Sequence, residues 1–130
     1  MNGTVLVVDD TESIRVLLQG VLAGLNCHCE ALGSGEEAIV WFDAHHSRID
    51  LVILDLSLPD RDGASVFTHL RKRDPSVPVV LMSGHGENET AQQLRRHGAA
   101  GFLAKPFAID TVRETVRHWI KIRTNRAIRR

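Results

Sequence analysis

Residues 51–60 read LVILDLSLPD, and they give the clearest indication of the fold class. Four apolar residues, Leu51 to Leu54, end abruptly in the carboxylate of Asp55, and a turn containing Pro59 follows. A short, continuous apolar run bounded by a turn is typical of a strand that is buried on both faces, as in a parallel sheet. Such a strand delivers Asp55 to its carboxyl end, which indicates that this carboxylate has a specific task.

Four other apolar runs predict strands, at residues 4–8, 27–31, 79–82 and 100–104. Helices are predicted between them, because apolar residues recur at spacings of three and four, for example from Ile14 to Leu25. Further helices are expected after Ser34, after Gly63, over about residues 88–97 and from Ile109 onward. The order βαβαβαβαβα with short connections predicts an α/β fold, a parallel sheet with helices on both faces.

The composition fits one globular domain, with 130 residues of which 43% are hydrophobic and 25% charged. No apolar run approaches the roughly 18 residues needed to span a bilayer, and no basic segment precedes the first run. We therefore expect no signal peptide, no membrane insertion and a cytoplasmic location. The two cysteines, Cys27 and Cys29, fit neither a zinc motif nor a disulfide framework and are expected to be reduced thiols in the core.

Charge is unevenly distributed, although the formal net charge is zero. Residues 1–114 hold 10 basic and 16 acidic residues, a net charge of about −6, whereas residues 115–130 hold basic residues and no acid. Cations that complement the dipole at the end of a helix explain this better than a nucleic-acid footprint, so no direct nucleic-acid binding is expected. Residues 123–130 are predicted to be a basic extension of the last helix or the start of a linker.

Polar side chains directly follow four of the predicted strands: Asp9 and Asp10, Asp55, Ser83 and Lys105. The carboxyl ends of parallel strands meet at one edge, where ligands bind in folds of this class. Neighbouring carboxylates repel unless a cation lies between them, and Mg²⁺ favours one or two carboxylates together with a phosphate. An ammonium and a hydroxyl can bind phosphoryl oxygens. The set therefore favours phosphoryl transfer with an aspartate as nucleophile.

Other chemistries fit less well. A Gly-x-Ser-x-Gly hydrolase elbow around Ser83 would need glycine where Leu81 stands. The adjacent His45 and His46 have no evident third partner for a metal site. Residues 55–57 match half of the Asp-x-Asp signature of haloacid-type phosphatases, but the second acid, which serves as general acid and base, is missing.

The features after the strands stand in a fixed order: Asp9-Asp10, Asp55 with Pro59 four residues later, Ser83, and Lys105-Pro106-Phe107. This combination resembles the receiver domain of two-component response regulators, from Val5 to about Ile120. The segments around Ser83 and Lys105 look most like receivers attached to hybrid sensor histidine kinases. The resemblance implies a (βα)5 flavodoxin-like, doubly wound sheet with strand order 2-1-3-4-5, in a receiver domain spanning residues 1–122.

The resemblance also implies a role for each residue of the site. Asp55 would accept a phosphoryl group from a histidine kinase or a histidine-phosphotransfer protein. Mg²⁺ (or Mn²⁺) would be held by Asp10, Asp55 and the main-chain carbonyl of Ser57, with Asp9 acting through a metal-bound water. Lys105 would pair with a phosphoryl oxygen.

Further positions would carry the switch and the lifetime of the phosphoryl group. Ser83 would bond the phosphoryl group and move inward, and Phe102 occupies the switch-aromatic position of the family. Because phenylalanine has no polar ring substituent, apolar burial alone would govern its packing. The Lys105–Pro106 peptide bond would be cis. Ser57 and His85 occupy the two positions that tune the lifetime, in a direction that the sequence leaves open.

The resemblance predicts a signalling switch that catalyses only its own phosphorylation and slow dephosphorylation. Its output face would be the fourth helix, fifth strand and fifth helix, which would dock partners or form a homodimer. Two alternatives are a Mg²⁺-dependent phosphohydrolase that forms an aspartyl phosphate and a phosphorylation-independent pseudo-receiver. The complete set of acids, hydroxyl and lysine argues against the pseudo-receiver.

Overall fold

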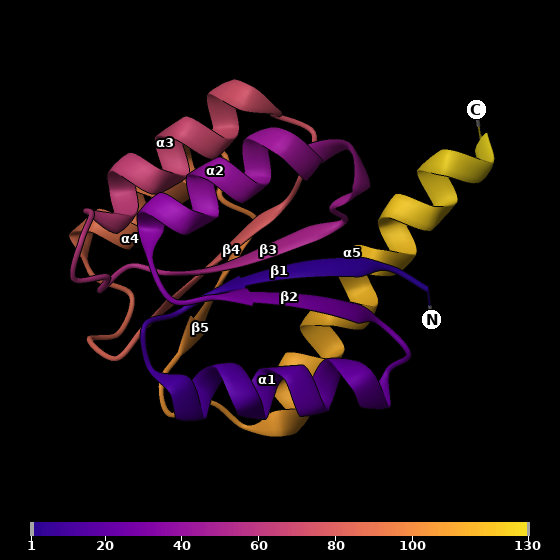
Figure 1. Cartoon of the computed structure of the whole chain (residues 1–130), viewed down its shortest axis with the longest axis horizontal. Coiled ribbons are helices and arrows are strands. Elements are labelled where there is room, and N and C mark those ends of the chain that lie inside the picture. Colours follow the sequence, from indigo (N-terminus) through magenta and orange to yellow (C-terminus); the bar gives the residue numbers. More distant parts are fainter. Residues whose placement is uncertain (1, 130) are drawn as a thin grey trace.

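The computed structural model describes the backbone of residues 2–129 and the side chains of residues 2–123. Strands and helices alternate along the chain (Figure 1). The strands are β1 (Thr4–Val8), β2 (His28–Leu32), β3 (Leu51–Asp55), β4 (Val79–Ser83) and β5 (Gly101–Ala104). The helices are α1 (Glu12–Gly24), α2 (Gly35–His45), α3 (Gly63–Arg73), α4 (Glu89–Arg96) and α5 (Ile109–Arg129), and a 3-10 helix, η1 (His46–Arg48), follows α2.

The five strands form one parallel sheet in the order β2-β1-β3-β4-β5, which confirms the predicted fold. Helices α1 and α5 cover one face, and α2, α3 and α4 cover the other (Figure 1). The strand order reverses between β1 and β3, which is where ligands bind in folds of this class. Asp9 and Asp55 stand at the carboxyl ends of these two strands.

The central strands are apolar throughout because both faces of the sheet are covered. Along β1, Leu6 and Val8 pack under α2–α4, whereas Val5 and Val7 pack under α1 and α5. All residues of Leu51–Leu54 are fully buried. Each such side chain contributes roughly 1.5–3 kcal/mol through its removal from water. The burial of β3 on both faces therefore fixes the position of Asp55 at the carboxyl end of the strand.

Several strand ends differ by one residue from the sequence-based prediction. β3 and β4 extend to Asp55 and Ser83, because Asp55 pairs with Met82 in the ladder and the N–H of Leu56 donates to the Met82 carbonyl at 3.0 Å. β2 begins at His28 rather than Cys27, since the N–H of Cys27 still donates to the end of α1. β5 begins at Gly101 rather than residue 100. The functional carboxylate and hydroxyl are therefore the last members of their strands.

Helix ends follow the local sequence closely. Asn26 adopts a positive φ of 58° just past α1, as expected for an asparagine that ends a helix. Ser34 caps α2: its hydroxyl accepts the N–H of Glu37 at 3.1 Å and donates to the Glu37 carboxylate at 3.0 Å. These contacts confirm the predicted start of α2.

Both cysteines pack against the core under α1 and α5 and form no disulfide. Burial raises the pKa of the Cys29 thiol to about 12, so this thiol is unreactive at neutral pH.

Within the described residues, no helix is long and apolar enough to cross a membrane. The predicted basic extension covers residues 123–130. The side chains of residues 124–130 lie outside the described ones, so the assignment of this segment stays a prediction.

Candidate functional site

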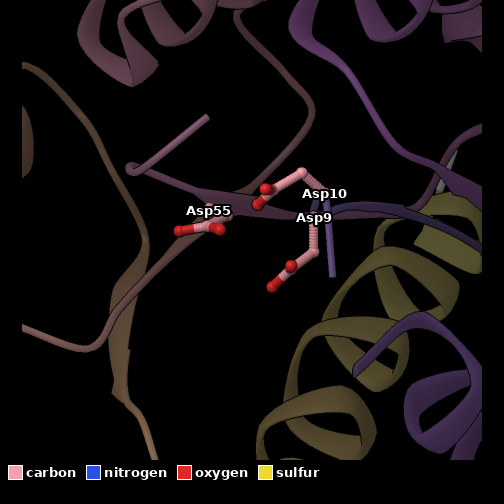
Figure 2. A group of neighbouring side chains, drawn as sticks. All are labelled: Asp9, Asp10 and Asp55. Carbon is pink, nitrogen blue, oxygen red and sulfur yellow. The ribbon is translucent and has the colours of Figure 1, made fainter. Parts of the chain in front are cut away.

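Three carboxylates lie together at the carboxyl ends of β1 and β3 (Figure 2). One oxygen from each of Asp9, Asp10 and Asp55 lies within 4.8 Å of the others. Asp9 is 0% exposed and Asp55 is 2% exposed, whereas Asp10 is exposed to solvent. Three acids at this spacing repel one another, and two of them have lost most of their hydration. The cluster therefore needs positive charge.

Lys105 supplies part of that charge. Its Nζ lies 2.6 Å from Asp9 Oδ2 and 3.3 Å from Asp55 Oδ2, so one ammonium bridges the two buried acids. The contact with Asp9 is a close ion pair, and the contact with Asp55 is both an ion pair and a hydrogen bond. Burial alone would lower the pKa of Lys105, but the paired carboxylates outweigh burial and raise it. Lys105 is therefore charged at neutral pH.

The charged form of Asp55 remains destabilised despite the contact with Lys105. Burial, the largest cause, and repulsion from Asp9 raise the pKa of Asp55. The N–H of Ser57, which donates to Asp55 Oδ1 at 3.0 Å, and the Lys105 ammonium act in the opposite direction without cancelling the rise. A divalent cation beside this carboxylate would stabilise its charged form. Three convergent carboxylates are also the hard oxygen donors that Mg²⁺ prefers, so the residues present fit that ion.

Backbone contacts fix the acidic loop after β1. Asp9 Oδ1 accepts the N–H of Thr11 at 2.8 Å, which leaves Oδ2 to face Lys105. The guanidinium of Arg15, in the first turn of α1, donates to the main-chain carbonyl of Asp9 at 2.8 Å. The sequence analysis missed Arg15, although a cation five residues after an acidic pair was a usable signal. Its bond orients the peptide between the two adjacent acids.

The remaining predicted site residues follow β4 and β5. Ser83 is 2% exposed and its hydroxyl accepts the N–H of His85 at 3.1 Å; His85 itself is exposed. Phe102 is half-buried and packs against the core under α2–α4. The Lys105–Pro106 peptide bond is cis. Ser83 and Lys105 thus stand at the same edge as the carboxylates, since β4 pairs with both β3 and β5.

Fold and site together define the class: a doubly wound α/β protein with an acidic, lysine-bridged site at its strand switch point. Residues 5–117 match the family model described as response regulator receiver domain. The chain belongs to the response regulator receiver domain family.

Two relatives differ in how much of their length the chain covers. It is 38% identical over 114 residues to the luminescence regulatory protein LuxO of Vibrio campbellii, covering 88% of this chain and 25% of that protein. It is 31% identical over 125 residues to sporulation initiation phosphotransferase F of Bacillus subtilis, covering 96% of this chain and 99% of that protein. The chain thus spans about a quarter of LuxO and nearly all of the phosphotransferase. The expected similarity to receivers of hybrid sensor kinases stays a prediction.

Solved structures agree with this placement. The signal receiver domain of the LuxO repressor protein from Vibrio parahaemolyticus has a TM-score of 0.88 at 27% identity, covering 98% of this chain and 97% of that one. The structure of a CheX–CheY–BeF3–Mg complex from Borrelia burgdorferi has a TM-score of 0.83 at 26% identity, covering 88% of this chain and 86% of that one. Receiver domains act as phosphorylation-dependent signalling switches, and the family assignment does not favour the phosphohydrolase alternative.

Proposed function

We propose that Asp55 accepts a phosphoryl group from the phosphohistidine of a histidine kinase or a histidine-phosphotransfer protein, in the cytoplasm, and that this modification sets the state of the switch. The observation that supports Asp55 most directly is the Lys105 ammonium, which bridges it to the fully buried Asp9. A nucleophilic carboxylate beside a fixed cation is the arrangement that phosphoryl transfer uses. The receiver domain is proposed to span residues 1–122.

The metal ligands of the proposal are the carboxylates of Asp10 and Asp55 and the main-chain carbonyl of Ser57. Asp9 would contribute through a water rather than directly, which is consistent with the contacts that Thr11 and Lys105 make to its two oxygens. Mg²⁺, or Mn²⁺, supplies positive charge to the phosphoryl oxygens and to the clustered acids when it is bound. Exposed Asp10 offers an approach for the ion from solvent.

In the transfer step, a carboxylate oxygen of Asp55 forms a bond to phosphorus while the bond from phosphorus to the histidine nitrogen breaks. The electron pair of that bond stays with the departing imidazole. Lys105 then pairs with a phosphoryl oxygen, and the Ser83 hydroxyl donates to another. Ser57 and His85 flank the acceptor and tune the rate at which water removes the group.

The switch connects this edge of the sheet to its β5 side. Inward movement of Ser83 makes room for Phe102, which lines a groove of about 320 Å³ together with Thr115, His118 and Trp119. Because Phe102 carries no polar ring substituent, apolar burial governs its position. The surface of α4, β5 and α5 is the proposed output face for a partner or a second copy.

The test is phosphorylation by a small-molecule donor, acetyl phosphate with Mg²⁺, followed by intact-mass spectrometry. One phosphoryl group per chain is expected, and none in Asp55→Asn. Sustained turnover of phosphate monoesters would instead identify a phosphohydrolase, and unchanged signalling by Asp55→Asn would identify a pseudo-receiver. Gel filtration with beryllofluoride and Mg²⁺ tests the homodimer, and an unchanged mass would eliminate it as the output.

A further inference from the structure

The turn between β2 and α2, residues 33–35, has close neighbours on two sides, and one of them binds it. On one side, the Arg15 guanidinium lies 3.0 Å from where a Cβ on Gly33 would stand. On the other, the carboxylate of Asp60 accepts the N–H of Gly35 at 2.9 Å and that of Glu36 at 3.0 Å. Asp60 belongs to the loop between β3 and α3, so these bonds join two loops that lie far apart in the sequence.

Asp60 binds the first turn of a helix that already has its own cap. Ser34 satisfies the N–H of Glu37, and Asp60 satisfies those of Gly35 and Glu36, which are otherwise unpaired at the start of a helix. The two backbone bonds lower the pKa of Asp60, so its carboxylate stays charged. The local cap sets where α2 begins, and Asp60 adds a connection to the β3–α3 loop.

The junction is also tightly packed. A Cβ on Gly35 would lie 2.9 Å from Val66 Cγ2 and 3.0 Å from Arg61 Cβ, so a larger residue there would force these neighbours to move. Arg61 additionally pairs with the exposed Glu36 at 3.4 Å. The start of α2 therefore lies directly against the loop that carries Asp60.

The segment between Asp55 and Asp60 is anchored at both ends. At its start, the N–H of Leu56 donates to Met82, and the N–H of Ser57 donates to Asp55. At its end, Asp60 is bound to α2, and between them Leu58 is buried. The position of the Ser57 carbonyl is thus set by contacts on both sides of it.

We propose that Asp60 is a positioning residue for the metal site: by binding the first turn of α2, it holds the main-chain carbonyl of Ser57 where Mg²⁺ requires it. The proposal rests on the proposed function, in which this carbonyl is a metal ligand. Outer contacts of this kind orient ligands and typically change metal affinity by about 10- to 100-fold when they are lost.

The test is the dissociation constant of Mg²⁺, measured by amide NMR titration of the unphosphorylated protein. Asp60→Ala is expected to weaken Mg²⁺ binding by about 10-fold. Asp60→Asn, which keeps only one of the two oxygens that accept these N–H groups, is expected to have an intermediate affinity. The matched control is Asp62→Ala, since Asp62 is an exposed acid of the same loop that caps only its own helix, through the N–H of Ala64 at 3.1 Å. Its Mg²⁺ affinity is expected to stay within about twofold.

Hydrogen exchange gives a readout that needs no metal. The amides of Gly35, Glu36 and Ser57 are expected to exchange faster in Asp60→Ala and to be unchanged in Asp62→Ala. Wild-type Mg²⁺ affinity in folded Asp60→Ala would overturn the proposal; if that variant does not fold, wild-type affinity in Asp60→Asn would overturn it equally. Failure of the wild-type protein itself to bind Mg²⁺ would instead contradict the proposed metal site.

Discussion

The ammonium of Lys105 lies closer to Asp9, at 2.6 Å, than to Asp55, at 3.3 Å. In the unphosphorylated chain, the principal partner of Lys105 is therefore a buried acid that is not the proposed acceptor. A phosphoryl group on Asp55 would compete with Asp9 for this cation. Lys105 thus links the resting site to the modified one.

Loss of Lys105 should destabilise the resting fold. In Lys105→Met, the fully buried Asp9 would lose the cation beside its Oδ2, and an unpaired buried carboxylate is costly. Because Lys105 is itself about one-fifth exposed, we expect a loss of roughly 1–3 kcal/mol in the free energy of unfolding. Urea denaturation with and without Mg²⁺ measures it, and the ion should restore part of the loss. Equal stability of variant and wild type would show that Asp9 does not depend on Lys105.

Asp55→Asn should stabilise the metal-free protein at neutral pH. Burial and Asp9 raise the pKa of Asp55, so the folded state binds its proton more tightly than the unfolded state does. Its ionisation therefore costs stability as the pH rises from the ordinary pKa, about 3.9, through the folded pKa. Removing the charge should add about 1 kcal/mol at neutral pH, and this gain should vanish in acid. Denaturation curves across a pH series test this, and Mg²⁺ should favour wild type over Asp55→Asn.

Asp74 should show the opposite pH dependence. Burial alone would raise the pKa of Asp74, but bonds from Ser76 and His46 outweigh burial and lower it. The resulting stability is present above the ordinary carboxyl pKa of about 3.9 and is lost as the pH falls through the lower folded pKa. At neutral pH, Asp74→Ala should cost about 1–2 kcal/mol, since it removes the 2.7 Å contact with His46 and the 2.6 Å bond from Ser76. A difference from wild type that persists undiminished in strong acid would contradict this cause.

Gly63→Ala should disturb the acceptor loop by steric contact. A Cβ on Gly63 would lie 2.6 Å from Leu56 Cα, next to Asp55, and backbone cannot move away as a flexible side chain can. We expect a loss of roughly 1–3 kcal/mol in stability and slower phosphorylation by acetyl phosphate.

Gly20→Ala is the matched control for this substitution. It lies within α1 and has nothing within 4 Å of the added Cβ. It should stabilise the chain by about 0.5–1 kcal/mol and leave phosphorylation unchanged. A Gly63→Ala variant that behaves like Gly20→Ala would show that the loop has room for the added methyl group.

The sequence predicted the sheet, its edge and five polar residues at that edge because each of these residues follows a buried apolar run. In a parallel sheet that position alone determines which residues meet. The contacts of Arg15 and Asp60 could not be predicted in this way, since each depends on how a loop closes on a distant segment. The unequal distances from Lys105 to Asp9 and Asp55 likewise depend on side-chain packing rather than on the order of residues in the sequence. Strand β2 was misplaced by one residue because its edge position gives a weaker apolar pattern.

The combined charge of the three clustered carboxylates and the Lys105 ammonium affects which ion valence suits the site. Their formal charges sum to about −2 when all four groups are ionised, which a single divalent ion neutralises. A monovalent ion would leave the cavity with an excess negative charge, and a trivalent ion would reverse its sign. The site can therefore distinguish ions by charge before their radius or geometry matters.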